Sequence, residues 1–228
     1  MNLVVALDRE NLSENLKLVR EIKGLPVWVK VGFRSFIRDG WKILDEIRSI
    51  DPNLKIFLDL KLYDIPNTMA DASEEIAETR KVDMFNIHAS AGIRAMRSVM
   101  ERLQKFEKRP LVLSVTALTS FTEDEFSDVY QSEIISKSLE FSKWSFQSGI
   151  DGVVSSVWES QKIKEATSSE FLTLTPGIRP FGESSDDQKR VANLEMAKNE
   201  LSDFIVVGRP IYKSENPKSV VQQILETF

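Results

Sequence analysis

Eight short apolar runs recur along the chain, and amphipathic segments separate them. The expected strands are Leu3–Leu7, Val27–Val31, Ile56–Leu60, Met84–His88, Leu111–Val115, Gly152–Ser155, Leu172–Thr175 and Phe204–Val207. The expected helices include Leu12–Ile22, Ile43–Ile50, Met69–Thr79, Ile93–Phe106, Glu133–Gln147, Val191–Leu201 and, last in the chain, Pro217–Phe228. Strands that are apolar along nearly their whole length are typical of parallel sheets buried on both faces.

This alternation predicts an α/β fold and, within that class, a (β/α)8 TIM barrel. The 228 residues give each of eight strand-and-helix units about 28 residues, which suits a barrel of ~250 residues. The main alternative is an open flavodoxin-like or Rossmann sheet, but no Gly-x-Gly-x-x-Gly sequence follows the first strand. No linker rich in proline, glycine and serine divides the chain, so we expect one domain over residues 1–228.

Two connections are long and polar. The segment from Leu118 to Tyr130 is rich in serine, threonine and acidic residues, which indicates a solvated loop. The segment from Pro176 to Lys189 lies beside arginines and is a candidate lid over a bound ligand. An ordinary surface loop is the alternative for this second segment.

The third expected strand ends in a cluster of charges. Asp59 and Lys61 are two residues apart, so their side chains share one face of a strand, and Asp64 follows just beyond. Burial of charges is costly unless they pair, and a salt bridge needs only one acid for one base. The second acid therefore indicates a chemical role. Because two carboxylates favour its ammonium form, Lys61 is better suited to donate a proton than to form a Schiff base.

Polar residues also follow the other expected strands. The active sites of TIM barrels lie at the carboxyl ends of the strands. The polar groups expected there are Asp8, Lys30, His88 and Thr119, with Gly177 and Arg179 after the seventh strand and Gly208 and Arg209 after the eighth. Barrels often bind phosphate after these last two strands, and arginine binds phosphate bidentately. We therefore expect a pocket for a phosphorylated ligand.

Composition excludes several functional classes. The chain has no cysteine and one histidine, which excludes thiolate chemistry, disulfides and multi-histidine metal sites. Its net charge of −5 argues against a nucleic-acid partner. No apolar run approaches the ~20 residues that span a bilayer, and the N-terminus lacks the pattern of a signal peptide. We therefore expect a cytoplasmic protein without a membrane partner.

These motifs together resemble the orotidine 5′-phosphate decarboxylase family, in its bacterial type, nearly from end to end. The matching segments are Val5–Asp8, Val29–Gly32, Phe57–Lys61, Asp64–Thr68, Asn86–Ser90, Val115–Thr119, Thr175–Pro180, Asp187–Val191 and Gly208–Pro210. The string Asp-x-Lys-x-x-Asp-Ile-Pro-Asn-Thr, which starts at Asp59, is the most specific. Bacterial members often carry Phe-His where this chain has Leu62-Tyr63, a change that leaves the charged residues intact.

The resemblance implies decarboxylation of orotidine 5′-phosphate to UMP in de novo pyrimidine biosynthesis, with no metal or organic cofactor. It implies that Lys61 stabilises the carbanion at carbon 6 and then donates the proton. The implied catalytic array is Lys30, Asp59, Lys61 and Asp64. The implied substrate contacts are Asp8, Lys30 and Asp59 near the ribose and the reacting carbon, Thr119 at the pyrimidine, and Arg179, Gln188, Gly208 and Arg209 at the phosphate. A homodimer is also implied, in which Asp64 and Thr68 reach into the neighbouring subunit's pocket.

Two alternatives stay open. Sugar-phosphate decarboxylases such as 3-keto-L-gulonate 6-phosphate decarboxylase share Asp-x-Lys-x-x-Asp but use magnesium to stabilise an enediolate. The segment Ile65–Thr68 of this chain differs from theirs. A non-catalytic nucleotide-binding barrel is the second alternative, and the presence of Lys61 with both aspartates argues against it.

Overall fold

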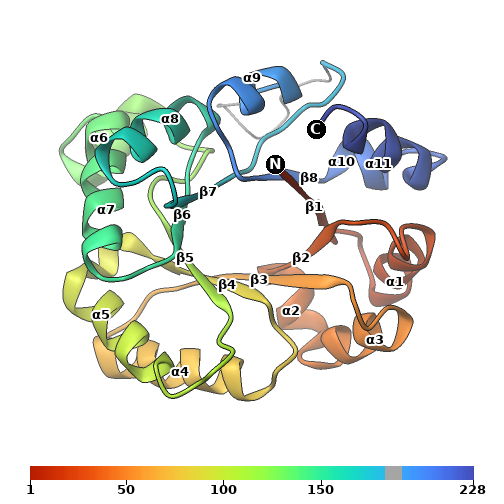
Figure 1. Ribbon diagram of the computed structural model, residues 1–228, viewed down its shortest axis with the longest axis horizontal. Helices are drawn as coiled ribbons and strands as arrows, with labels where there is room; N and C mark the ends of the chain where they lie inside the picture. The colour runs from red at the N-terminus through yellow and green to blue at the C-terminus, as the bar shows by residue number, and fades with distance from the viewer. Residues whose placement is uncertain (183–191) are drawn as a thin grey trace.

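The strands of this chain close into a parallel barrel, which Figure 1 shows from one end. The computed structural model describes residues 1–182 and 192–228. In order around the ring, the strands are β1 (Asn2–Ala6), β2 (Trp28–Gly32), β3 (Lys55–Leu62), β4 (Met84–His88), β5 (Leu111–Val115), β6 (Gly152–Val154), β7 (Leu172–Thr175) and β8 (Phe204–Val207). Because β1 also pairs in parallel with β8, the predicted (β/α)8 TIM barrel is confirmed.

Helices form a ring outside the strands (Figure 1). They are α1 (Leu12–Glu21), α2 (Phe33–Asp39), α3 (Lys42–Ile50), α4 (Pro66–Glu78), α5 (Gly92–Leu103), α6 (Glu123–Tyr130), α7 (Ile134–Gln147), α8 (Val157–Ala166), α9 (Leu194–Asn199), α10 (Arg209–Tyr212) and α11 (Pro217–Leu225), with a short 3-10 helix at Ala89–Ala91. The helix expected from Val191 is the shorter α9, and Val191 itself lies outside the described residues. Within residues 1–182 and 192–228, none of the helices is long and apolar enough to cross a bilayer.

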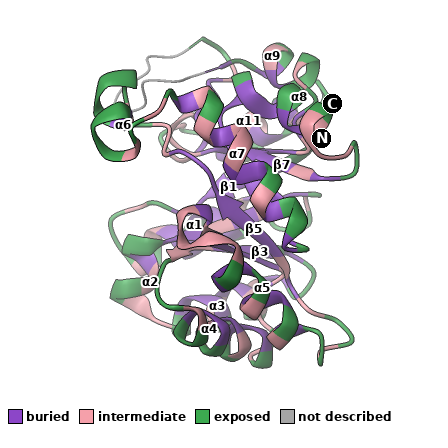
Figure 2. Ribbon diagram, turned by 90° about the vertical axis from the view of Figure 1, so that its left-hand side faces the viewer, coloured by how far each residue is buried: buried purple, intermediate pink, exposed green. Residues whose placement is uncertain are grey.

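The strands are buried on both faces, as their apolar sequences predict (Figure 2). Alternate residues point inward, so Val4 and Phe57 pack with other inward side chains inside the barrel. Their neighbours Val5 and Leu58 point outward and pack in the layer between the strands and the helices. The carboxyl ends of the strands are thereby left as the face on which polar side chains can gather.

The connection predicted as a solvated loop contains α6, so that prediction is wrong for Glu123–Tyr130. The Thr122 side chain accepts the N–H of Glu125, and the Glu125 carboxylate accepts the N–H of Thr122. This reciprocal capping box starts the helix despite its acidic composition. Phe126 then anchors the helix because its ring is fully buried.

Aspartates recur at the amino end of the barrel, immediately before three even-numbered strands. These aspartate clamps are Asp83 before β4, Asp151 before β6 and Asp203 before β8. Each carboxylate accepts a backbone N–H from the preceding odd-numbered strand at 2.7 to 2.8 Å. Each also forms an ion pair: Asp83 with Arg48 and Lys55, Asp151 with Arg109, and Asp203 with Lys164. The clamps therefore tie adjacent strands together at the end of the barrel away from the pocket.

Candidate active site

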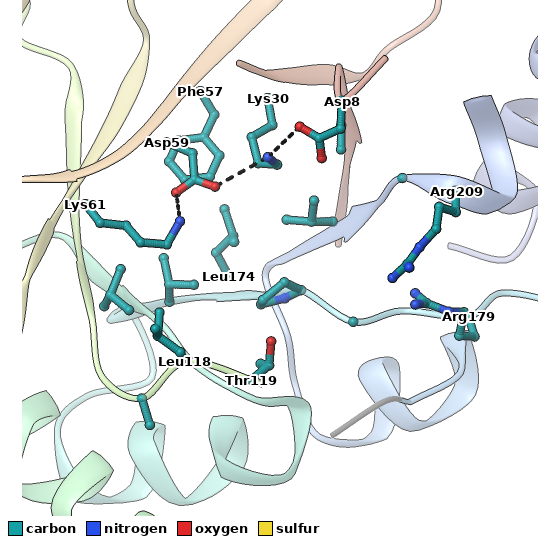
Figure 3. Close-up of a pocket in the computed structure, with 18 of the residues that line it drawn as sticks. Asp8, Lys30, Phe57, Asp59, Lys61, Leu118, Thr119, Leu174, Arg179 and Arg209 are labelled. Atoms are coloured by element: carbon teal, nitrogen blue, oxygen red, sulfur yellow. Dashed lines mark hydrogen bonds and ion pairs between the residues drawn. The ribbon is translucent and has the colours of Figure 1, made fainter. Parts of the chain in front are cut away.

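A cavity of about 390 Å³ opens at the carboxyl ends of the strands. Its charged lining residues are Asp8, Lys30, Asp59, Lys61, Arg179 and Arg209, and Thr119 and Gly208 also line it. These residues come from the ends of six strands, β1, β2, β3, β5, β7 and β8, or from the segments that follow them. All eight were predicted from the sequence as site residues. Figure 3 shows Asp59 and Lys61 at one side of the cavity and the two arginines at the other.

The acidic and basic groups alternate along the first side of the cavity (Figure 3). Lys30 Nζ lies 3.3 Å from Asp8 Oδ1 and 3.4 Å from Asp59 Oδ2. The other oxygen of Asp59, Oδ1, lies 2.6 Å from Lys61 Nζ. The side chains of Lys30 and Asp59 are 12% and 14% exposed, whereas that of Lys61 is 37% exposed. Lys61 is therefore the more accessible of the two ammonium groups to a ligand.

Pairing keeps this array charged although it is buried. Burial by itself raises the pKa of the Asp59 carboxyl, but the charges of Lys30 and Lys61, with hydrogen bonds from Lys61 and Asn86, outweigh it and lower the pKa to about 2. Burial lowers the pKa of Lys30, and the charges of Asp59 and Asp8 reverse that effect and raise it. The site therefore holds a carboxylate and an ammonium in fixed places at neutral pH.

The backbone of β3 departs from a regular strand at Lys61. β3 runs two residues further than predicted, its register with β4 shifts between Leu58 and Leu62, and Lys61 has a φ of 52°. Asn86 of β4 contacts this segment: its Oδ1 accepts the Lys61 N–H, and its Nδ2 donates to Asp59. Sequence reasoning gave Asn86 no role, although a lone amide in an apolar strand was a usable signal.

The two arginines follow the last two strands, as predicted. Arg179 follows β7 and is only 6% exposed, and its Nη1 donates to the carbonyl of Ile178. Arg209 begins α10 directly after Gly208. In Figure 3 both guanidinium groups lie at the same side of the cavity. Two fixed cations on one side of a pocket suit an anionic group such as phosphate.

Two predicted site residues are not in this cavity, and the position of a third is not described. Among the described residues, the lining does not include Asp64 or Thr68, and both are exposed on the turn after β3 and the start of α4. Gln188 lies outside the described residues, as does half of the predicted lid, from residue 183 on. The chain therefore positions Asp59 and Lys61 within its own pocket and leaves Asp64 at the surface.

His88 lies at the carboxyl end of β4, as predicted, and its side chain makes a local hydrogen bond. Its Nδ1 accepts the backbone N–H of Ser90. Burial, and then the positive charge of Lys61, lower the pKa of His88 to about 4. Phe57 and Tyr212 also line the cavity and were not predicted as site residues. Within the described residues, no three histidine or acidic side chains gather where they could share a metal ion.

Comparison with known proteins identifies the family. The sequence profile described as "Orotidine 5'-phosphate decarboxylase / HUMPS family" matches residues 1–224. The chain belongs to this family. Its members include the orotidine 5'-phosphate decarboxylase of Campylobacter fetus subsp. fetus, which is 61% identical over 225 residues, 99% of this chain and 98% of that protein. The corresponding protein of Sulfurimonas denitrificans is 61% identical over 226 residues, 99% of each chain.

A solved structure of the family agrees with the barrel described above. The crystal structure of orotidine 5'-phosphate decarboxylase from Lactobacillus acidophilus is 33% identical, with a TM-score of 0.84. It covers 100% of this chain and 98% of its own. The family fold therefore extends over the whole of the described chain.

Proposed function

We propose that this chain decarboxylates orotidine 5′-phosphate to UMP in pyrimidine biosynthesis. The observation that carries the proposal is the two-sided cavity, with the Asp59–Lys61 pair on one side and Arg179 and Arg209 on the other. The substrate has a matching polarity, because it carries a carboxylated pyrimidine at one end and a phosphate at the other. The names of relatives about 60% identical over nearly the whole chain support the same activity.

Lys61 performs the chemical step in this proposal. The bond between carbon 6 and the carboxylate breaks, carbon dioxide leaves, and the electron pair stays on carbon 6. The Lys61 ammonium, already fixed by Asp59 at 2.6 Å, stabilises this charge without reorganisation. It then donates a proton to carbon 6, and solvent returns the proton to the amine. Lys30 and the ionised Asp59 keep the array in place.

The remaining pocket residues bind the substrate. Asp8 and Lys30 contact the ribose, and Thr119 lies against the pyrimidine. Arg179, Gly208 and Arg209 hold the phosphate, with Gln188 added from the loop. Contacts to the phosphate, far from carbon 6, supply binding energy that the enzyme uses in the chemical step.

The proposed enzyme is a homodimer with shared active sites. Asp64 and Thr68 are exposed in the single chain, and the flanking Tyr63 and Ile65 are 64% and 66% exposed. Exposed apolar side chains that adjoin a functional residue favour a covered surface. In the dimer Asp64 completes the charged array of its neighbour's pocket. We propose a cytoplasmic location and neither a nucleic-acid nor a membrane partner.

The deciding assay follows the loss of orotidine 5′-phosphate absorbance with the purified chain in excess EDTA. Turnover in EDTA at the rate seen without it supports the cofactor-free reaction. Turnover that stops in EDTA and returns with magnesium would favour the sugar-phosphate decarboxylase alternative, for which 3-keto-L-gulonate 6-phosphate is the parallel test substrate. No turnover of either compound would favour a binding protein.

Mixed dimers test the shared site. Chains carrying Lys61→Ala and chains carrying Asp64→Ala should each be inactive alone. After subunit exchange, half of the dimers are mixed and one of their two sites is intact, so about a quarter of wild-type activity should return. No recovery, despite exchange shown by differently tagged subunits, would contradict the sharing of Asp64.

A further inference from the structure

The pairing of β3 and β4 is irregular beside the Asp59–Lys61 pair. The register shifts between Leu58 and Leu62, so residues 59–61 of β3 face Asn86 alone in β4. Irregularities of this kind re-aim side chains and recur next to active sites. Within this one, Lys61 has a φ of 52°, a left-handed conformation that side chains other than glycine rarely adopt. A contact outside the regular strand ladder must therefore hold the Lys61 backbone.

The side chain of Asn86 makes that contact and a second one. Its Oδ1 accepts the Lys61 backbone N–H at 2.7 Å, and its Nδ2 donates to Asp59 Oδ1 at 2.8 Å. The same Asp59 oxygen accepts a hydrogen bond from Lys61 Nζ at 2.6 Å. The three residues thus form a closed ring of hydrogen bonds. The backbone and the ammonium group of Lys61 are both fixed by one amide and one carboxylate.

The chemistry of this ring requires an amide at position 86. The Lys61 N–H needs an acceptor and the Asp59 carboxylate needs a donor, and an amide supplies both from one planar group. A carboxylate at this position would face the Asp59 carboxylate. An apolar side chain would leave the partly buried Lys61 N–H without its acceptor. Asn86 is 1% exposed and lies behind the pair, outside the lining of the cavity.

We propose that Asn86 is a positioning residue, whose amide holds the irregular turn of β3 that aims Lys61 Nζ into the cavity. It acts through Asp59 and Lys61 and does not touch the substrate. The inference rests on the proposed function, because the aim of Lys61 matters to turnover only if Lys61 delivers the proton. A displacement of 1 Å in a catalytic group can reduce the rate by about 10²-fold.

The test compares Asn86→Ala and Asn86→Asp with the wild type. Asn86→Ala should lower kcat by about 100-fold with little change in KM, because the substrate contacts remain. Asn86→Asp keeps the size of the side chain but places a second carboxylate against that of Asp59. Its kcat should rise as pH falls and one of the two acids takes up a proton, whereas the wild type shows no such rise. If Asn86→Ala does not fold, the pH profile of Asn86→Asp decides.

Thr173→Val is the matched control, since it also removes a buried polar group from a barrel strand. The Thr173 hydroxyl bonds Ser160 and Asp203 at the amino end of the barrel. This variant should lose stability and keep its kcat. A wild-type kcat in Asn86→Ala, or an Asn86→Asp pH profile parallel to that of the wild type, would overturn the proposal.

Failure of the proposed function gives a different result, because the wild type itself would not turn over orotidine 5′-phosphate. Crystal structures of the wild type and of Asn86→Ala then test the positioning role directly. The expected change is a return of Lys61 to negative φ, with Nζ displaced from Asp59. An unchanged Lys61 in the variant would overturn the positioning role.

Discussion

The barrel carries paired charges at both of its ends, but their partners differ. At the amino end, the aspartate clamps each accept a backbone N–H from the neighbouring strand. At the carboxyl end, Asp59 accepts its hydrogen bonds from the side chains of Lys61 and Asn86. The first arrangement uses a carboxylate to join strands. The second uses a carboxylate to place an ammonium in a cavity.

Backbone conformation shows the same contrast. The clamps Asp151 and Asp203 join strand pairs whose register does not shift, and Asp83 joins β3 to β4 in the part of that pair that lies before the shift. The Asp59–Lys61 pair lies where the register between β3 and β4 shifts and where the backbone of Lys61 has a left-handed conformation. Strained conformations cost stability and persist where the surroundings over-determine them, which is common at functional sites. The comparison therefore assigns stability to the amino-end charges and chemistry to the carboxyl-end charges.

Asp59→Asn should produce the largest effect. It is also the substitution at the carboxyl end that we expect to lower both kcat and stability. We expect kcat to fall at least about 10³-fold, because Lys61 loses its orienting charge. Stability should also fall by about 1 to 2 kcal/mol, since buried Lys30 keeps only Asp8. Kinetics and urea titration measure the two effects, with exposed Asp124→Asn on α6 as the control. If the Asp59→Asn variant kept the wild-type kcat, the assignment of chemistry to the carboxyl-end charges would be wrong.

The same variant also tests how the stability contribution of Asp59 depends on pH. The folded-state pKa of Asp59 is about 2, below its usual 3.8, so its contribution to stability is complete above 3.8. The contribution is lost as pH falls from 3.8 toward 2, because over that range the unfolded state takes up a proton that the folded state does not. The stability difference between wild type and Asp59→Asn should shrink over that range. A difference that does not change with pH would contradict the pairing described for Asp59.

Arg209→Ala should have a smaller effect, on binding. Loss of one charge-assisted contact to phosphate should raise KM by about 10-fold to 100-fold. The urea midpoint should change little, because Arg209 lies at the cavity and not among the clamps. Arg20→Ala, an exposed arginine of α1, is the control. Equal losses of binding and of stability would make Arg209 a structural residue and blur the distinction between the two ends.

The smallest expected effect is the influence of Lys61 on His88. The chain has one histidine, so its ring protons can be followed through a pH titration by NMR. The pKa should lie near 4 in the wild type and rise in Lys61→Ala, because the nearby positive charge is removed. Stability should decline as pH falls from 6.5 toward 4, where only the unfolded state binds the proton. If the pKa of His88 were the same in Lys61→Ala as in the wild type, the Lys61 charge would not be a cause of its lowering.

Much of this arrangement could be predicted from the sequence. All eight strands follow from apolar runs, because a parallel barrel buries both faces of each strand. The positions of Lys30, Asp59 and Lys61 at strand ends were enough to place them in one pocket. The capping box at Thr122 was also readable, although the acidic composition of α6 directed the prediction to a loop.

Other features depend on tertiary contacts that a single sequence does not reveal. The extra residues of β3 opposite Asn86 become visible only when the register with β4 is known. Asp64 is close to Lys61 in sequence, yet the turn after β3 leaves it exposed on the single chain. Local spacing predicts which residues share a face of a strand. It does not predict where the strand stops being regular.

The most direct test of the contrast between the two ends is one paired measurement of kcat and unfolding free energy for Lys61→Ala and Arg109→Ala. In Lys61→Ala, kcat should fall at least about 10³-fold, and unfolding free energy should stay within about 1 kcal/mol, since Asp59 keeps Lys30 and Asn86. In Arg109→Ala, unfolding free energy should fall by about 2 kcal/mol, because Asp151 loses both guanidinium donors, while kcat stays unchanged. If both variants lost activity and stability in parallel, the separation of chemistry from stability along the barrel axis would be wrong.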